Sequence, residues 1–402
     1  MTHPSGRPIY MDHNATTPAL AGVVEAMRPY FTEEYGNPSS SHAYGRRAAS
    51  AVEEARAHVA ALIGAGPDEI LFTAGATESD NLALRGAAPA AARRLGMATG
   101  AGHIITCAIE HEAVLETCEA MREEGWEISV LPVDGDGLVE PGDVARAMTD
   151  WTVMVSLMMA NNEIGTVEPL EEVGRICRRR GVLLHSDAVQ GAGRVPLDVE
   201  TLGVDLMSLT AHKMYGPKGI GALYVRRGVP VSPMMRGGGQ EGRVRSGTLN
   251  VPGIVGFGKA AQIAMSDMAV ESARESSLRD LLWRRIRARI EDVRLNGHPS
   301  HRLPNNLNVA FDGVESEALL TSLRDVVALS SGSACASGSG KGSYVIRALR
   351  GGDAGAARSS IRFGLGRCTV EDDIDLVMEH LERAVSRLRA MAPKAAGAAE
   401  RS

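Results

Sequence analysis

The chain has few aromatic residues and no long hydrophobic run, and these absences exclude several classes of protein. Aromatic residues make up 4% of the 402 residues, so we do not expect the stacking platforms on which proteins hold single-stranded nucleic acid. The longest apolar stretch, residues 153–160, is far shorter than the roughly 20 residues that a transmembrane helix needs. The formal net charge is only −6. We therefore expect neither a nucleic-acid partner nor a membrane anchor.

Cysteine is also scarce, and the few cysteines are spaced too widely for a disulfide framework. The chain has five of them and no C-x-x-C pair, and they are Cys107, Cys118, Cys177, Cys335 and Cys368. An odd number of widely spaced thiols fits a reducing compartment, and the first ten residues lack the apolar run of a signal peptide. We therefore expect a cytoplasmic protein. All cysteines except Cys335 are expected to be structural, with Cys107 and Cys177 buried.

What the sequence does contain is an alternation of short apolar runs and helical patterns. The runs that predict strands are residues 69–73, 103–108, 153–158, 182–186, 206–210 and 221–225. The helical patterns include residues 171–180, 253–291 and 370–391. Continuous apolar strands between helices predict an α/β fold with a mostly parallel sheet covered on both faces. The length of 402 residues also leaves room for a second, smaller domain.

Cys335 lies in a run of glycines and serines, residues 330–340, and not among apolar neighbours. Such residues resist regular structure and cannot build a core, so the run predicts a mobile loop that touches solvent. A thiol on a flexible arm suits chemistry that takes up a group in one place and delivers it in another. A flexible linker that happens to contain a cysteine is the alternative, and this run alone does not separate the two.

Two candidate sites follow predicted strands. Residues 73–81 leave the first strand and enter a helix, where backbone N–H groups and a threonine hydroxyl form a ready anion site. A plain helix cap is the alternative. Lys213 follows the strand at 206–210 beside a glycine-rich turn. A lysine that loses its proton forms Schiff bases with carbonyls, including pyridoxal phosphate. An ordinary solvated lysine is the alternative, and for a single lysine taken alone it is the favoured one.

A third candidate is a carboxylate at the end of another predicted buried strand. Asp187 directly follows residues 182–186, where an unpaired charge is costly. A pyridinium nitrogen would be a suitable partner, because an ionised aspartate keeps such a ring protonated and able to accept electrons. A helix N-cap is the alternative. Gln190 lies three residues on and is near enough to address the same ligand.

Three more polar residues stand at predicted strand ends or late in the chain. His111 could stack on a flat ring or move protons, although a lone histidine is more often structural. Asn162 could donate to a ring oxygen. Arg362 could clamp a substrate carboxylate or form a surface ion pair. The candidates follow the layout of a fold type I pyridoxal-phosphate enzyme. In chain order they are the anion site at 73–81, the histidine, the asparagine, the aspartate, the lysine and the late arginine.

The same stretches carry a resemblance to one family. They are Tyr-Met-Asp-His-Asn-Ala-Thr-Thr-Pro at 10–18, Gly-Asn-Pro-Ser-Ser at 36–40, Ala-Thr-Glu-Ser at 76–79, Asn-Asn-Glu-Ile-Gly at 161–165, Ala-His-Lys-Met-Tyr-Gly-Pro-Lys-Gly at 211–219, Arg-Ser-Gly-Thr at 245–248 and the run at 330–335. With them the chain resembles the class I cysteine desulfurases of the IscS/NifS type, which are fold type I pyridoxal-phosphate enzymes. The similarity covers nearly the whole chain, to about residue 391.

The resemblance implies a role for each candidate. Lys213 would hold pyridoxal phosphate covalently, Asp187 would pair with its ring nitrogen, and His111 would stack on the ring and help move protons. The other cofactor contacts would be Ala76, Thr77, Thr210 and His212 at the phosphate, Gln190 and Asn162 near the ring oxygen, and Thr248 at the phosphate of the other subunit of a homodimer. Arg362 and Asn37 would hold the substrate carboxylate, and Cys335 would be the nucleophile.

The implied activity is removal of sulfur from L-cysteine. The products would be L-alanine and a persulfide on Cys335, which would pass to an acceptor protein, as in iron–sulfur cluster assembly. No resident metal is implied, only a transient contact of Cys335 with an iron–sulfur cluster. A related transaminase or lyase that does not use the thiol, and a non-catalytic sulfur-carrier or scaffold protein, stay open as alternatives.

The resemblance also implies a domain plan. A large cofactor-binding domain with a seven-stranded type of sheet would span residues 16–259. A smaller α+β domain would combine residues 1–15 and 260–391, and residues 392–402 would form a disordered tail. Residues 338–342 depart from the usual continuation after the cysteine. That departure leaves the acceptor and the loop's mobility open, and the motifs do not separate the housekeeping type from the nitrogen-fixation type.

Overall fold

The computed structural model describes residues 7–98, 100–332, 342–349 and 354–391. Its largest feature is a seven-stranded sheet with the order β2-β8-β7-β6-β5-β3-β4. The strands are β2 (Ile70–Thr73), β3 (His103–Cys107), β4 (Glu127–Leu131), β5 (Thr152–Ser156), β6 (Leu183–Asp187), β7 (Leu206–Thr210) and β8 (Gly221–Val225). All neighbouring pairs are parallel except β2–β8 and β7–β8. The prediction of an α/β fold with a mostly parallel sheet is confirmed.

The strands are apolar because helices cover both faces of the sheet. Every residue of β3, β5 and β7 is buried. Successive residues of one strand, such as Ile104 and Ile105 of β3, enter two different apolar clusters, because successive side chains of a strand point to opposite faces of the sheet. The helices α3 (Ala43–Leu62), α8 (Leu170–Arg180) and α10 (Val251–Arg289) contribute to one cluster, and α5 (Ala88–Arg94) and α6 (Glu112–Glu123) to the other.

A second apolar core forms around a smaller antiparallel sheet of the order β12-β10-β9. Its strands are β9 (Val293–Asn296), β10 (Asn306–Phe311) and β12 (Ser360–Gly364), and β1 (Ile9–Tyr10) pairs in parallel with β11 (Val327–Ala328) nearby. The helices α11 (Ser316–Leu323) and α14 (Glu371–Met391) pack on this core, and α12 (Tyr344–Ala348) and α13 (Ala354–Ser359) lie beside it. The predicted helices at 171–180, 253–291 and 370–391 correspond to α8, α10 and α14.

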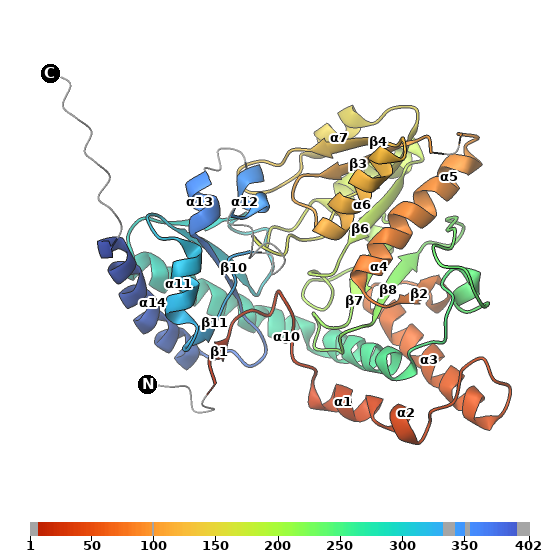
Figure 1. The fold of residues 1–402 in the computed structure, drawn as a ribbon, viewed down its shortest axis with the longest axis horizontal. Coiled ribbons are helices and arrows are strands. Elements are labelled where there is room, and N and C mark those ends of the chain that lie inside the picture. The colour runs from red at the N-terminus through yellow and green to blue at the C-terminus, as the bar shows by residue number, and fades with distance from the viewer. Residues whose placement is uncertain (1–6, 99, 333–341, 350–353, 392–402) are drawn as a thin grey trace.

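One long helix connects the two cores. The first half of α10 places Ile254 and Phe257 in the core of the large sheet, and its second half places Leu282 and Ile286 in the second core. Figure 1 shows α10 running along the lower side of the molecule from one to the other. The helix thus passes through the expected boundary at residues 259 and 260, and the domain division itself stays a prediction.

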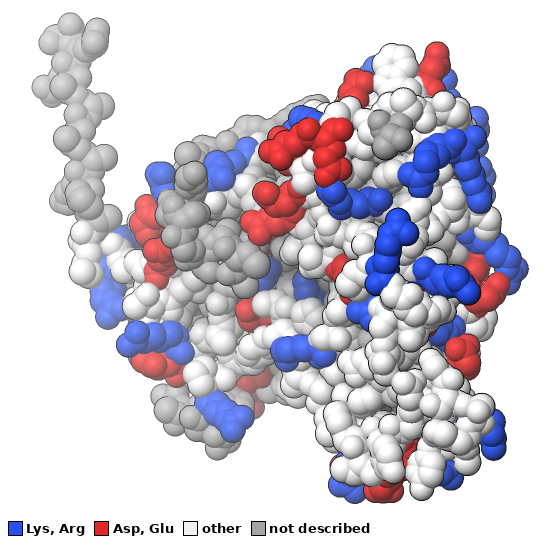
Figure 2. Space-filling view, turned by 45° about the vertical axis from the view of Figure 1, so that its right-hand side comes forward, with Lys and Arg blue, Asp and Glu red and all other residues white. Residues whose placement is uncertain are grey.

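The remaining described helices are short, and they are α1 (Ala21–Met27), α2 (Pro29–Thr32), α4 (Ala76–Asn81), α7 (Pro141–Ala147) and α9 (Val199–Leu202). Within the described residues, none of the helices has both the length and the apolarity that a bilayer crossing requires. On the face in Figure 2, several basic side chains gather toward the upper right and several acidic ones at the upper centre, with wide uncharged areas below them.

Candidate active site

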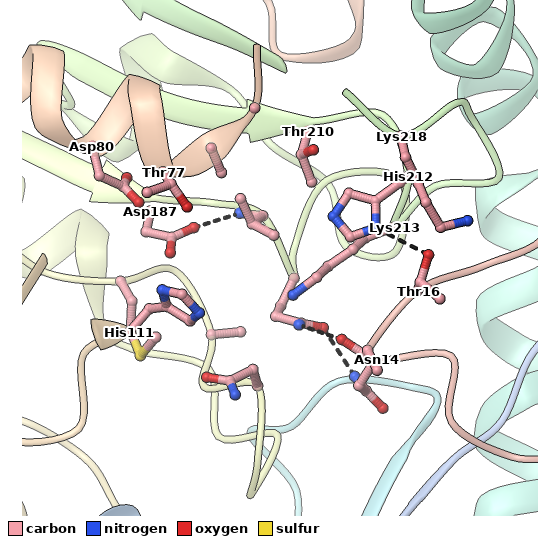
Figure 3. A pocket seen from close by; sticks show the side chains of 18 of the residues that line it. Asn14, Thr16, Thr77, Asp80, His111, Asp187, Thr210, His212, Lys213 and Lys218 are labelled. Carbon is pink, nitrogen blue, oxygen red and sulfur yellow. Dashed lines mark hydrogen bonds between the residues drawn. The ribbon is translucent and has the colours of Figure 1, made fainter. Parts of the chain in front are cut away.

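A cavity of about 440 Å³ opens at one edge of the large sheet. Its lining includes these residues predicted from the sequence: Ala76, Thr77, His111, Asn162, Asp187, Gln190, Thr210, His212, Lys213 and Arg362. Figure 3 shows Lys213, His111 and Asp187 pointing into the same space from different elements. The structure thus brings together residues that span almost three hundred positions of the sequence.

The sheet explains this convergence. Asp187 and Thr210 are the last residues of β6 and β7, and His111 follows β3 as the N-cap of α6. In an open parallel sheet the carboxyl ends of the strands meet at one edge, and ligands bind there. Lys213 is placed by the turn after β7, where Tyr215 has a left-handed backbone with φ of 66°.

One end of the cavity is built to receive an anion. The first hydrogen bond of α4 runs from the Ser79 N–H to the Gly75 carbonyl, so the N–H groups before Ser79 have no partner within the helix. The hydroxyls of Thr77 and Thr210 line the same cavity. The acidic Glu78 does not repel an anion strongly, because Arg245 pairs with its carboxylate at 2.8 Å. A phosphate group would find donors and little opposing charge here.

Lys213 has the environment of a reactive amine. Burial lowers its pKa to about 8 from the ordinary 10.5, while the negative charge of Asp187 works in the opposite direction. A substantial fraction of this amine is therefore neutral near pH 8. Neutral lysine is the nucleophilic form that condenses with a carbonyl.

His111 is held as a neutral imidazole. Burial lowers its pKa, with Asp187 opposing the shift and Lys213 adding to it. Its Nδ1 accepts a hydrogen bond from the Ala113 N–H at 3.1 Å, which leaves the ring proton on Nε2. A neutral ring with one N–H is suited to lie against a flat ligand and to exchange a proton with it.

The part of the cavity around Asp187 contains a carboxylate and a pair of amides. Asp187 is 7% exposed, and one of its oxygens accepts from the Val189 N–H at 2.9 Å. Gln190 exchanges two hydrogen bonds with Asn14, at 2.9 and 3.0 Å. Asn162 has a buried side-chain oxygen without a hydrogen-bond partner. Such an atom needs a partner that a bound ligand would supply.

Arg362 lines the cavity but is already engaged on two sides. It is 1% exposed, donates to Asp12 Oδ1 at 2.8 Å and donates to the Asn162 carbonyl at 2.8 Å. Its Nε has no partner. A substrate carboxylate would therefore share this guanidinium with Asp12, and the predicted clamp stays a prediction.

Two predicted residues of the described part of the chain do not join the lining of this cavity. Asn37 and Thr248 are exposed and are absent from the lining. For Thr248 this fits the expected contact with the cofactor of another subunit, which a single chain does not test. Cys335 lies outside the described residues, as does the expected tail at 392–402. Cys107 and Cys177 are buried and free, as predicted.

Sequence reasoning missed several residues of the cavity wall, including Asn14, Thr16, Asp80 and Lys218. Thr16 reaches the Nδ1 of His212 at 3.1 Å (Figure 3). The signal for Asn14 and Thr16 was present, because both lie in a polar run near the N-terminus that resembles the family. No role was assigned to that run, since its distance in sequence from β6 and β7 gives no hint of contact.

The residues present fit pyridoxal phosphate. The cavity combines an anion site for the phosphate, an amine with a lowered pKa for the aldehyde, and a carboxylate for a basic ring nitrogen. The buried side-chain oxygen of Asn162, which has no protein partner, is available to a polar ligand. No single feature is specific, but the three together match the three polar groups of this cofactor.

Comparison with known proteins agrees with the geometry. The sequence profile of the family described as Aminotransferase class-V matches residues 9–377. The chain is 52% identical to "Cysteine desulfurase IscS" from Anaeromyxobacter sp. (strain Fw109-5), over 96% of this chain and 94% of that one. It is 46% identical to the protein of the same name from Dictyoglomus turgidum, over 96% and 97%. A solved structure titled "NIFS-LIKE PROTEIN" has a TM-score of 0.86 and 36% identity, over 94% and 100%.

Proposed function

The chain belongs to the aminotransferase class-V family of pyridoxal-phosphate enzymes, and from this premise we propose that it is a cysteine desulfurase. It removes sulfur from L-cysteine, releases L-alanine and holds the sulfur as a persulfide on Cys335. The observation that carries the proposal is the identity of 52% over 96% of the chain to a relative with that name. The cavity supports the cofactor, but by itself it fits other reactions of the same cofactor.

The proposed cofactor contacts follow the three polar parts of the cavity. Lys213 forms the covalent bond to the cofactor, Asp187 pairs with the ring nitrogen, and His111 lies against the ring. The remaining contacts are Ala76, Thr77, Thr210 and His212 at the phosphate and Gln190 and Asn162 near the ring oxygen. When bound, the cofactor supplies an electron sink for bond breaking at the substrate.

The chain's own residues then orient the substrate and move protons. Arg362, with Asn37, holds the substrate carboxylate. Lys213 is suited to take the α-proton, because burial lowers its pKa to about 8 and a base works best with a pKa near the working pH. Neutral His111 is suited to exchange the thiol proton of the substrate through Nε2. Asp187 pairs with the ring nitrogen.

The sulfur step uses Cys335. Its thiolate attacks the sulfur of the substrate, a sulfur–sulfur bond forms, and the bond from sulfur to the β-carbon breaks. The electron pair stays with the carbon, which takes a proton and leaves as L-alanine. The persulfide then passes to an acceptor protein, and iron–sulfur cluster assembly is the pathway that we propose.

We also propose that the protein works as a homodimer in the cytoplasm. Several large apolar side chains near the N-terminus are exposed in the single chain, among them Val24, Phe31 and Tyr35. A second subunit would cover such residues, and Thr248 would reach the partner's cofactor. The four cysteines in the described part of the chain are free, which fits a reducing compartment.

The test is a comparison of the wild type with a Cys335→Ala variant. With an added thiol reductant that releases the persulfide sulfur as sulfide, the wild type should convert L-cysteine to L-alanine and sulfide. The variant should lose this activity while its visible cofactor absorbance persists. Alanine formation that survives undiminished in the variant would instead assign the reaction to a transaminase or lyase that does not use the thiol. A colourless wild-type protein that borohydride does not change would contradict cofactor binding altogether.

A further inference from the structure

Two chain segments that flank residues 333–341 lie against the same buried carboxylate. We call them the flanking segments, residues 330–332 and 342–344. The carboxylate belongs to Glu163, which is 0% exposed and directly follows Asn162 of the cavity wall. No role has been assigned to Glu163 above, although buried carboxylates are costly and rarely without purpose.

The segment at 342–344 contacts Glu163 through a short hydrogen bond. Ser343 Oγ donates to Glu163 Oε2 at 2.5 Å and accepts from the Ile346 N–H at 3.0 Å, so it also caps α12. The next residue, Tyr344, donates its hydroxyl proton to the Glu110 carbonyl at 2.6 Å. Glu110 immediately precedes His111. This flanking segment therefore binds Glu163 and Glu110, which are the sequence neighbours of Asn162 and His111 in the cavity wall.

The segment at 330–332 also lies close to the Glu163 carboxylate. A Cβ atom on Gly332 would lie 2.6 Å from Glu163 Oε2, a distance that ordinary side chains do not tolerate. The close approach thus requires glycine at this position. The same segment is held to β12, because the Arg362 N–H donates to the Ser330 carbonyl at 2.7 Å. Arg362 itself lines the cavity.

Glu163 is itself held rigidly. Its N–H donates to Asn161 Oδ1 at 2.8 Å, and its carbonyl accepts from the side-chain amides of Asn306 and Asn308 at 3.2 and 3.1 Å. These contacts join the loop after β5 to strand β10 of the smaller sheet. With the backbone of Glu163 fixed in this way, the hydrogen bond from Ser343 to its carboxylate holds the flanking segment at 342–344 against the cavity wall.

We propose that Glu163 is a positioning residue that fixes both flanking segments against the cavity wall and thereby supports the step carried out by Cys335. The inference rests on the proposed function, since it concerns sulfur transfer to that thiol. Its physical basis is effective concentration: a reacting group tethered at two fixed points meets its target far more often than a loosely tethered one. Cofactor binding and proton transfer by Lys213 do not depend on this tether.

The experiment separates these two kinds of step in holoenzyme variants. Alanine formation from L-cysteine needs Cys335, whereas exchange of the α-proton of L-alanine with deuterium oxide needs the cofactor and Lys213 but no thiol. Glu163→Ala should lower kcat for alanine formation by about 10²-fold, with KM and the exchange rate unchanged. Glu163→Gln should restore most of kcat, because its side-chain oxygen still accepts from Ser343.

A matched control is Glu168→Ala. Glu168 is also a buried glutamate of this segment, but it accepts from the Val139 N–H, away from the flanking segments. That variant should keep both reactions. If Glu163→Ala does not fold, Ser343→Ala removes the other half of the hydrogen bond and should also lower kcat without lowering exchange.

Three outcomes would overturn the inference. Equal losses of exchange and alanine formation in Glu163→Ala would make Glu163 a general support of the site. Unchanged kcat would remove its role entirely, and a Gln variant as slow as the Ala variant would exclude the hydrogen bond. Failure of the proposed function looks different, because the wild type itself would then form no alanine from cysteine.

Discussion

At the scale of single residues, burial and one nearby charge determine the chemistry of the cavity. Burial removes the water that would stabilise a protonated Lys213, so its pKa falls to about 8. Asp187 partly opposes this shift and keeps the amine from losing its proton completely. The result is an amine that can be either a nucleophile or a proton carrier near neutral pH.

The first prediction concerns the pH dependence of cofactor attachment. Only the neutral amine attacks the aldehyde, so the rate at which the cofactor-free protein forms its visible absorbance should rise with pH and level off above about 8. Stopped-flow absorbance with added pyridoxal phosphate measures this rate. A Lys213→Arg variant is the control and should form no such band. A midpoint near the ordinary lysine value of 10.5 would contradict the prediction.

The second prediction concerns Asp187→Asn. An amide cannot stabilise a protonated ring nitrogen, so kcat for alanine formation should fall by about 10²–10³-fold. The variant also removes the negative charge that raises the pKa of Lys213, so the midpoint of cofactor attachment should shift to lower pH. Asp205→Asn changes a carboxylate that precedes β7, at the opposite end of the strand from Thr210, and that does not line the cavity. This variant should leave both quantities unchanged.

The sequence allowed prediction of cavity residues that stand next to strongly apolar strands. Asp187 and Thr210 end β6 and β7, and such positions are visible in one sequence because the apolar run stops there. The pairing of Asn14 with Gln190 was not predictable, since it joins residues 176 positions apart. The same holds for Asp12 and Arg362, which are 350 positions apart and meet because the chain just after β1 bridges to the end of β12, at Asp12 and Gly364.

At the scale of elements, the predicted strands lie within one or two residues of the observed ones. In the seven-stranded sheet the missed strand is β4, which stands at the edge and has only one buried residue. Its alternating polar residues resemble a surface segment more than a buried strand. The strands of the smaller sheet, β9, β10 and β12, were not predicted either. The end of α8 was predictable because Gly181 adopts a left-handed φ of 67°, which glycine accommodates without strain.

The third prediction concerns the attachment of the segment that carries Thr248. Arg56 of α3 makes two hydrogen bonds to Glu241, at 2.7 and 2.9 Å, and the Phe72 N–H of β2 donates to the same carboxylate at 2.7 Å. Glu241→Ala would remove the buried charge partner of Arg56 and leave it only the exposed Glu53. We expect a loss of about 3–5 kcal/mol in the free energy of unfolding, measured by urea denaturation.

The control for this variant is Asp68→Asn. Asp68 also pairs with an arginine, Arg227, at 2.7 Å, but both side chains are exposed. Solvent screens such a pair, so the unfolding free energy should hardly change. Equal effects of Glu241→Ala and Asp68→Asn would contradict the importance of burial for the first pair.

At the scale of the whole molecule, the two cores place the cavity where parts of both sheets meet. Arg362 comes from the smaller sheet, whereas Asp187 and Thr210 come from the larger one. The sequence predicted the existence of a second domain from chain length, but not the way in which α10 spans both cores. The contacts that a second subunit would make do not occur in a single chain, and Thr248 is the predicted residue whose role depends on such a contact.

The fourth prediction tests whether the site is shared between subunits. If Thr248 binds the phosphate of the partner's cofactor, a Thr248→Ala homodimer loses a hydrogen bond to a charged group and should bind the cofactor at least about tenfold more weakly. A mixed dimer of a Thr248→Ala chain and a Lys213→Ala chain should regain one complete site, because the second chain supplies an intact Thr248 to the first. Cofactor titration of tandem-tagged mixed dimers measures this recovery. If Thr248 served its own chain, the mixed dimer would bind as weakly as the Thr248→Ala homodimer, and a monomeric wild type in sedimentation would contradict the shared site directly.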